Sequence, residues 1–166
     1  MADPDAGRSA VINASPLIFL SRGGYLDLLR QFAERILVPA PVAEEIRMKG
    51  PDDVTARALS ETPWIEVVPI PRVPEEVIEW GLGTGESSVL AIAVAHPGME
   101  AIIDDLAGRK YAECLGIPLR GTLGIVLVAK KRGVVSLARP VVEDLIRSGL
   151  YLSRPLIDEA LKRVGE

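Results

Sequence analysis

The sequence predicts a three-layer α/β/α fold with a central, mostly parallel sheet. Short apolar runs alternate with longer helical patterns through most of the 166 residues. This alternation is typical of a parallel sheet covered by helices on both faces. The second observation is the stretch Ala101–Asp105, in which an apolar strand ends in two adjacent acids directly before a helix. Open α/β sheets place their ligands at such strand ends.

The first part of the chain contains three predicted strands, each followed or preceded by helical sequence. The strands are expected at residues 10–12, 36–38 and 64–68. The last of these alternates apolar and polar residues, as an edge or surface strand does. Ser15 is expected to cap the first helix, with Pro16 at its first position. The helices of this part are expected at residues 16–20, 25–32, 42–49 and 53–62.

The second part repeats the alternation after a stiff, proline-rich connector at residues 69–74. Thr84 is expected to cap a helix that is apolar all round, which predicts that this helix is buried. Pro118 places a short strand at an edge of the sheet. The predicted elements lie at residues 85–95, 101–103, 106–112, 117–119, 123–129, 139–148 and 153–164.

Composition and charge limit the classes of function. The net charge of −4, with 48% hydrophobic and 25% charged residues, indicates an ordinary globular domain rather than a broadly basic nucleic-acid binder. With one cysteine, Cys114, and one histidine, His96, the chain lacks the ligands for a cysteine or multi-histidine zinc site. Any metal would be held by oxygen atoms, which favours Mg²⁺ or Mn²⁺.

Residues 1–9 are polar and are expected to form a flexible tail, followed by a single domain at residues 10–166. The start of the chain has no apolar core of the signal-peptide type, and no apolar run reaches the length of a membrane span. A cytoplasmic protein without membrane contact is therefore expected.

Polar residues at strand ends and helix starts are expected to converge at one cleft. Asn13 ends the first strand and Asp104 ends a later one, and parallel strands point their carboxyl ends to the same edge. Glu45 lies on the flank of the buried face of its helix, whereas Glu44 is expected to face water. Glu86 falls in the first turn of another helix. Carboxylates gathered without histidine or a nucleophilic cysteine favour metal-assisted phosphodiester hydrolysis.

Each of these features also has a purely structural interpretation. Acids in the first turn of a helix complement the helix dipole. The cluster Lys130–Arg132 is a natural candidate for nucleic-acid contact, but cations before a glycine are equally typical of a helix C-terminus. The alternating glycines from Gly81 to Gly85 are spaced like a phosphate loop, yet no strand precedes them and no lysine supports them.

Five segments occur in an order that resembles the PIN domain family. The segments are Val11–Ile18, Val38–Ile46, Gly83–Glu86, Ile102–Ala112 and Gly121–Gly124. The resemblance covers nearly the whole chain and points to a prokaryotic subfamily of predicted nucleic-acid-binding proteins related to the VapC-type toxins. It implies a metal-dependent ribonuclease fold with a quartet of acids, RNA as the substrate, Mg²⁺ or Mn²⁺ as the cofactor, an antitoxin as a partner and a homodimer.

The resemblance also implies roles for particular residues. The implied metal ligands are Asn13, Glu45, Glu86 and Asp104. The implied catalytic acids are Glu45, Glu86, Asp104 and its neighbour or substitute Asp105. The implied substrate contacts are Ser15, Arg109 and Thr122.

The departure from the family is Asn13, where its nucleases carry aspartate. Asparagine is neutral and offers one ligand oxygen, so lower metal affinity and weaker catalysis are expected. One alternative is therefore a non-catalytic PIN-like module that binds RNA or a protein. Another is a small-molecule α/β enzyme that uses the glycine-rich stretch near Gly83.

Overall fold

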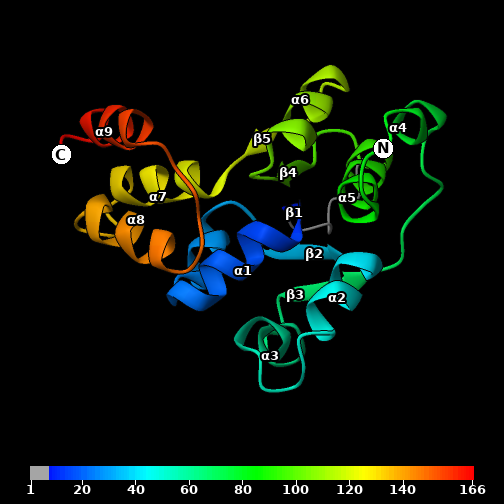
Figure 1. Ribbon diagram of the computed structural model, residues 1–166, viewed down its shortest axis with the longest axis horizontal. Coiled ribbons are helices and arrows are strands. Elements are labelled where there is room, and N and C mark those ends of the chain that lie inside the picture. The colour runs from blue at the N-terminus through cyan, green and yellow to red at the C-terminus, as the bar shows by residue number, and fades with distance from the viewer. Residues whose placement is uncertain (1–7) are drawn as a thin grey trace.

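The computed structural model describes residues 8–166 and contains a five-stranded sheet in which every neighbouring pair of strands is parallel (Figure 1). The strands are β1 (Ser9–Ile12), β2 (Arg35–Pro39), β3 (Ile65–Val68), β4 (Glu100–Ile102) and β5 (Leu119–Arg120). Their order across the sheet is β3-β2-β1-β4-β5. The predicted α/β fold with a central parallel sheet is confirmed, and both strands expected at edges lie at edges.

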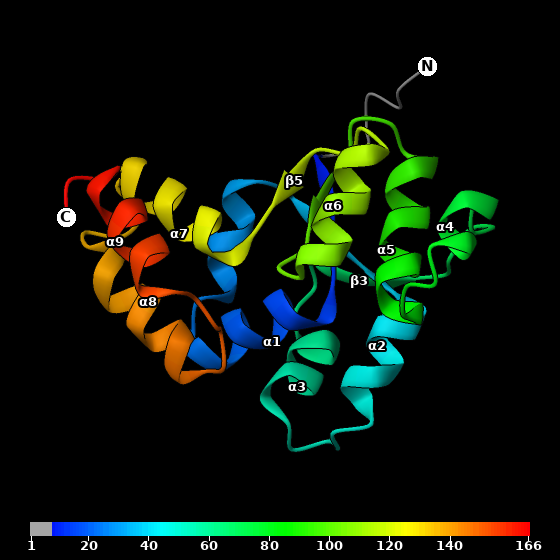
Figure 2. The ribbon, with the colours of Figure 1, turned by 45° about the horizontal axis from the view of Figure 1, so that its top comes forward.

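Helices flank the sheet on both sides. They are α1 (Ala14–Gly23), the 3₁₀ helix η1 (Leu26–Gln31), α2 (Ala40–Arg47), α3 (Val54–Glu61), α4 (Glu75–Glu79), α5 (Thr84–Ala95), α6 (Leu106–Cys114), α7 (Thr122–Lys131), α8 (Ala138–Arg147) and α9 (Arg154–Lys162). Helix α5 packs against β1, β2 and β4, and α7 and α8 pack against each other and against α1. Figure 2 shows α7–α9 gathered at one end of the molecule and α2, α4 and α5 at the other. Within residues 8–166, every helix is too short or too polar to cross a membrane.

The order in which the chain adds strands to the sheet reverses between β1 and β4. The chain runs outward from β1 through β2 to β3, and then crosses to β4 and β5 on the other side. Such a switch point leaves a crevice at the carboxyl ends of the two central strands. Asn13 follows β1 directly, and its backbone N–H donates to the Ile102 carbonyl of β4 at 3.0 Å. Asn13 and Asp104 therefore lie at the same edge of the sheet.

The core is aliphatic and is centred on β1. Val11 and Ile12 are completely buried, because β1 is covered by helices on both faces and by strands on both sides. Helix α5 buries every residue from Ser88 to Ala93, as expected for its apolar part, whereas Val94 and Ala95 at its end are exposed. Large side chains such as Leu17 and Ile102 fill the space between the layers.

Two helix starts differ from the prediction. The cap of α1 is Asn13 rather than Ser15, and its Oδ1 atom accepts a hydrogen bond from the Ala14 N–H at 2.9 Å. Asparagine caps helices as well as serine does, and the helix follows β1 without an intervening turn. Helix α5 begins at Thr84, so Gly83 occupies the cap position and Thr84 does not.

Other boundaries also shift. The edge strand is Leu119–Arg120, which starts two residues later than expected, because Pro118 has no N–H to donate to a strand ladder. The Pro118 carbonyl still accepts from the Ala101 N–H at 2.8 Å. The sequence pattern did not predict α4, which follows the proline-rich connector. Of the expected tail, residues 1–7 lie outside the described residues and Ser9 begins β1.

A hydrogen bond between Tyr25 and Asp144 ties the C-terminal helices to the start of the chain. The Tyr25 hydroxyl, next to α1, donates to the Asp144 carboxylate of α8, 119 positions away in sequence. The hydrogen bonds from Tyr25 and then Arg147 hold the pKa of Asp144 below its usual value. The same bond, with burial, raises the pKa of Tyr25.

We expect Tyr25→Phe to lower the urea midpoint of unfolding most between about pH 4 and pH 10, the ordinary pKa values of the two groups. Because folding lowers the pKa of Asp144, its contribution is present above the unfolded pKa and is lost as the pH falls through the lowered folded value. Because folding raises the pKa of Tyr25, its contribution is present below the unfolded pKa and is lost as the pH rises through the raised value.

Urea titrations of both proteins across this pH range measure the difference. Equal midpoints at every pH would show that the ring packing, which Phe keeps, and not the hydrogen bond, ties α8 to the domain.

Candidate functional site

A cavity of about 500 Å³ opens at the carboxyl end of β1, between the starts of α1 and α5 and the side of α2. Asn13 and Ser15 line it from the start of α1, Glu44 and Glu45 from α2, and residues 83–86 from the start of α5. We call this space the acidic cavity. The fold thus brings Asn13, Glu45 and Glu86 to one place from three separate elements. Glu44, which was expected only to face water, is exposed and also lines the cavity.

Gly85 leaves room between the amide and carboxylate oxygens of the acidic cavity. A Cβ atom at this position would lie 3.4 Å from Asn13 Oδ1 and 3.9 Å from Glu45 Oε2. The two oxygens therefore face one small space that a larger side chain would enter. Glu86 lies at the helix start itself, where its Oε2 atom would be 2.5 Å from a Cβ atom on Gly83.

Asn13 already has a structural task in this cavity. Its side chain is buried, with 7% of the residue exposed, and its Oδ1 atom is engaged with the first N–H of α1. An amide oxygen has two lone pairs, so one remains for a second partner.

Asp105 lies beside Glu86. It is exposed and caps α6, with its Oδ2 atom accepting from the Gly108 N–H at 2.8 Å. A Cβ atom on Gly108 would lie 3.6 Å from that Oδ2 atom and 3.7 Å from Glu86 Cγ. The side chains of Asp105 and Glu86 therefore border the same point, although they come from different helices.

Asp104 points away from this group and holds the start of α7. Its Oδ1 atom accepts from the Thr122 N–H at 2.7 Å, and its Oδ2 atom accepts from the Thr122 hydroxyl at 2.5 Å. Thr122 is completely buried. The implied contact between Thr122 and substrate is therefore not supported, since its hydroxyl is enclosed and bound to Asp104. Thr122 positions Asp104 instead.

Arg109 lies next to Asp104. Its Nη1 atom donates to the Ile103 carbonyl at 2.9 Å. A Cβ atom on Gly121 would be 2.6 Å from Arg109 Nη1 and 3.2 Å from Asp104 Oδ1. The absence of a side chain at Gly121 therefore lets the guanidinium and the carboxylate lie together over the junction of β5 and α7. A guanidinium has five N–H donors, so Arg109 retains donors for an anion.

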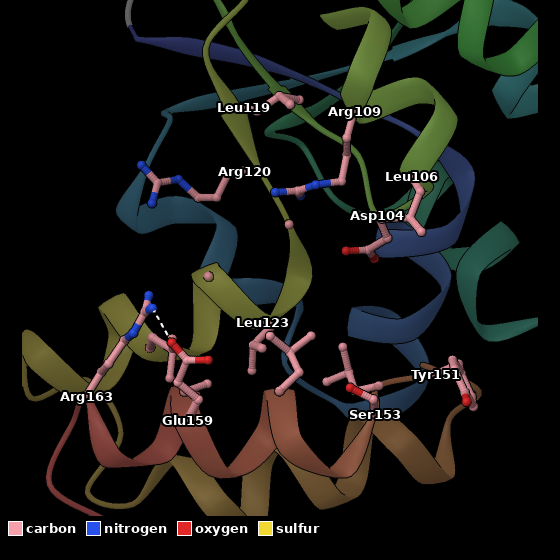
Figure 3. A pocket seen from close by; sticks show the side chains of 16 residues that line it. Asp104, Leu106, Arg109, Leu119, Arg120, Leu123, Tyr151, Ser153, Glu159 and Arg163 are labelled. Atoms are coloured by element: carbon pink, nitrogen blue, oxygen red, sulfur yellow. Dashed lines mark hydrogen bonds and ion pairs between the residues drawn. The ribbon is translucent and has the colours of Figure 1, made fainter. Parts of the chain in front are cut away.

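A second cavity, of about 700 Å³, lies beyond Asp104 between β5, α6, α7 and α9 (Figure 3). We call it the apolar groove. Asp104 and Arg109 form one wall, and Tyr151, Glu159 and Arg163 line the side of α9 and the turn before it. The sequence analysis did not predict this groove, because its two sides are more than 40 positions apart in the chain. The only signal was the apolar stripe of the last helix.

The basic cluster at the end of α7 is largely used within the fold. Lys130 donates to the Ser136 carbonyl, and its Nζ atom lies 3.8 Å from Glu166. Arg132 donates to the Gln31 carbonyl at 2.7 Å. These contacts favour the structural interpretation of Lys130 and Arg132.

Comparison with protein families agrees with this architecture. Residues 9–166 match the model of a family described as a PIN domain. The chain belongs to the PIN domain family. A search of curated proteins found no match. The resemblance predicted from the five ordered segments is thus confirmed, and the chain folds as a PIN-like module.

The acidic cavity of this PIN domain fits a hard divalent cation in the kind of ligands that it offers. Its polar side chains supply carboxylate, amide and hydroxyl oxygens, which are the ligands of Mg²⁺ and Mn²⁺. Within residues 8–166, no three Asp, Glu, His or Cys side chains stand close enough together to hold an ion. Glu45 is exposed and Glu86 is half-buried, so both have room to rotate towards the space at Gly85.

We expect Thr122→Val to lower the free energy of unfolding by about 2 kcal/mol, because it removes a hydrogen bond to a charged acceptor while keeping the side-chain volume. Thr55→Val is the matched control, since the Thr55 hydroxyl is also buried but bonds the neutral Ser21 hydroxyl. It should cost about 1 kcal/mol. Urea unfolding measures both. Equal losses would contradict a special role for the bond between Thr122 and Asp104.

Proposed function

We propose that this PIN domain is a Mg²⁺- or Mn²⁺-dependent ribonuclease that hydrolyses RNA phosphodiester bonds at the acidic cavity. The observation that carries the proposal is the meeting of Asn13, Glu45 and Glu86, from three elements, at the carboxyl edge of the sheet. Ligands of open α/β sheets bind at this edge, where the strand order reverses.

The chain's own residues have distinct tasks in this proposal. Glu45 and Glu86 would hold the cation, and Asn13 would add one neutral oxygen. A bound divalent cation polarises the phosphate and lowers the pKa of the attacking water. Arg109 would bind a phosphate oxygen of the RNA, because a guanidinium matches phosphate geometry. Ser15 is exposed at the rim of the cavity, where it would contact the substrate.

Of the two adjacent aspartates, we propose Asp105 as the acid that joins Glu86. Both side chains border the point that a Cβ atom on Gly108 would occupy. Asp104, the other candidate, has both carboxylate oxygens bound by Thr122 and lines the apolar groove. Asp104 would then be a positioning residue that holds α7 and the neighbouring Arg109 in place.

The second candidate function is a binding module without catalysis. It is favoured by one observation, namely that the Oδ1 atom of Asn13 already caps α1. The missing negative charge at this position also weakens the attraction for a cation. Such a module would keep the RNA-binding surface and lack hydrolysis.

The roles as a toxin with an antitoxin partner and as a homodimer stay predictions of the family resemblance. Light scattering of the purified protein tests the homodimer. Copurification from the source cell tests the antitoxin.

We expect cleavage of a single-stranded RNA in the presence of Mn²⁺, and a rate at least about 100-fold lower in Glu86→Gln and Asp105→Asn, because each loses a negative oxygen ligand. Asp104→Asn should reduce the rate less. Glu143→Gln is the matched control, since Glu143 is exposed on α8 and lines neither cavity. Gel analysis of the products over time measures the rates. Unchanged cleavage by Glu86→Gln would contradict the proposed site.

We expect Asn13→Asp to melt at a lower temperature than the native protein in EDTA and to gain more from Mn²⁺. Without a cation, the new carboxylate repels Glu45 and Glu86, whereas aspartate still caps α1. At a Mn²⁺ concentration about 100 times the Kd, the melting temperature should rise by about 5–10 °C. Thermal unfolding with and without Mn²⁺ measures these shifts.

The combination of melting and cleavage separates the two candidate functions. Cleavage only after Asn13→Asp would identify an intact scaffold whose chemistry is silenced by asparagine. A melting temperature that does not respond to Mn²⁺ in either protein would contradict a cation site in the acidic cavity.

A further inference from the structure

We propose that the apolar groove is a binding track for single-stranded RNA, in which Tyr151 stacks on a base and Arg163 contacts a phosphate. The inference rests on the proposed function only in taking RNA as the substrate. It adds a second RNA contact surface, outside the acidic cavity, made by the turn before α9 and by α9 itself.

The adjacent residues Asp104 and Asp105 link the groove to the acidic cavity. Asp104 lines the groove, while the next residue, Asp105, borders Glu86 of the acidic cavity. One aspartate of this pair at the carboxyl edge of β4 therefore lines the groove, and the other lies next to Glu86, which lines the acidic cavity. An RNA strand held in the groove would continue past Arg109 towards Glu86.

The groove offers apolar contacts of the kind that bases use. Its floor consists of aliphatic side chains, namely Leu119, Leu123, Leu127, Leu156 and Ala160. Tyr151 is 90% exposed and Leu106 is 83% exposed. Figure 3 shows both at the end of the groove near Asp104. An exposed aromatic ring stacks on any base, because every base has a π face.

The cationic groups of the groove lie where a backbone would pass. Arg109 reaches from α6 towards the middle of the groove, and Arg163 lies at the end opposite Tyr151 (Figure 3). The Arg163 side chain is 67% exposed and pairs with Glu159 on the same helix. The head of Arg120 points elsewhere, since it pairs with Glu100 and lies over the Phe32 ring. Arg109 and Arg163 are thus the cations that the groove presents.

The net charge of the C-terminal segment differs in sign from that of the rest of the chain, and this difference favours binding of a polyanion near α7–α9. Residues 122–166, which include α7–α9, carry eight lysines and arginines against five acids, a formal charge of +3. Residues 1–121 carry −7. The segment that contains α7–α9 thus carries a net positive charge, which favours a polyanion there. Positive charge combined with an exposed ring is typical of single-strand binding, whereas the stacked bases of a duplex would not reach Tyr151.

The test measures RNA binding in EDTA, where no cleavage occurs. The probe is a fluorescein-labelled oligoadenylate of about eight nucleotides, a length within the range of single-strand binding sites, and the readout is anisotropy at several salt concentrations. Tyr151→Ala should weaken binding about tenfold, and Tyr151→Phe, which keeps the ring, should bind like the native protein. Both positions tested are exposed, so the fold is expected to tolerate these changes.

Arg163→Gln should weaken binding and make the slope of log K against log salt shallower by about 0.7, the value for one phosphate contact in a single strand. Arg57→Gln is the matched control. Arg57 forms an exposed pair with Glu61 four residues later, as Arg163 does with Glu159 four residues before it, but it lies on α3, away from the groove. It should leave binding unchanged.

The proposal would be overturned if Tyr151→Ala and Arg163→Gln bound RNA like the native protein, or if Arg57→Gln lost as much affinity as Arg163→Gln. Absence of RNA binding by the native protein would also overturn it. Cleavage in Mn²⁺ is measured separately. If the groove variants bind RNA weakly and the native protein does not cleave RNA, the groove is supported and the ribonuclease is refuted. If the groove variants bind RNA normally and the native protein cleaves RNA, only the groove is refuted.

Discussion

The pairing of β1 with β4 is the interaction on which the rest of the structure depends. It joins the two halves of the sheet, because β2 and β3 extend from one side of β1 and β5 extends from the far side of β4. It also sets Asn13 beside the end of β4 through the hydrogen bond to Ile102. Both cavities open where these two strands end, so the chemistry of this PIN domain follows from a parallel register at the switch point.

The two adjacent aspartates show how the backbone divides similar side chains between different tasks. Successive residues of an extended chain point to opposite sides, so Asp104 and Asp105 diverge at the end of the strand. Asp104 is bound by Thr122 and secures α7, whereas Asp105 caps α6 beside Glu86. Asp105 therefore lies next to Glu86, which lines the acidic cavity, whereas Asp104 lines the apolar groove between β5, α6, α7 and α9.

Much of the fold could be predicted from local pattern, because a strand buried on both faces must be apolar along its length. This holds for Ala10–Ile12 of β1, and the apolar stretch Val89–Ala93 of α5 was likewise predicted to be buried. Helix boundaries were less predictable where two nearby residues can both serve as the cap. Asn13, and not Ser15, caps α1, because the helix begins directly after the strand. The short α4 has no apolar stripe long enough to distinguish it from the connector before it.

The sequence by itself determined the class of fold, the family and the oxygen-only set of candidate ligands, since these depend on local pattern and on the residue types present. It also indicated Asn13, Glu45 and Glu86, which follow strand ends or line helix faces. Only the tertiary structure decided that Thr122 is enclosed, that Asp105 rather than Asp104 borders Glu86, and that Tyr151 and Arg163 lie across a groove from Asp104. These placements depend on contacts between segments far apart in the chain, and the periodicity within one segment does not predict them.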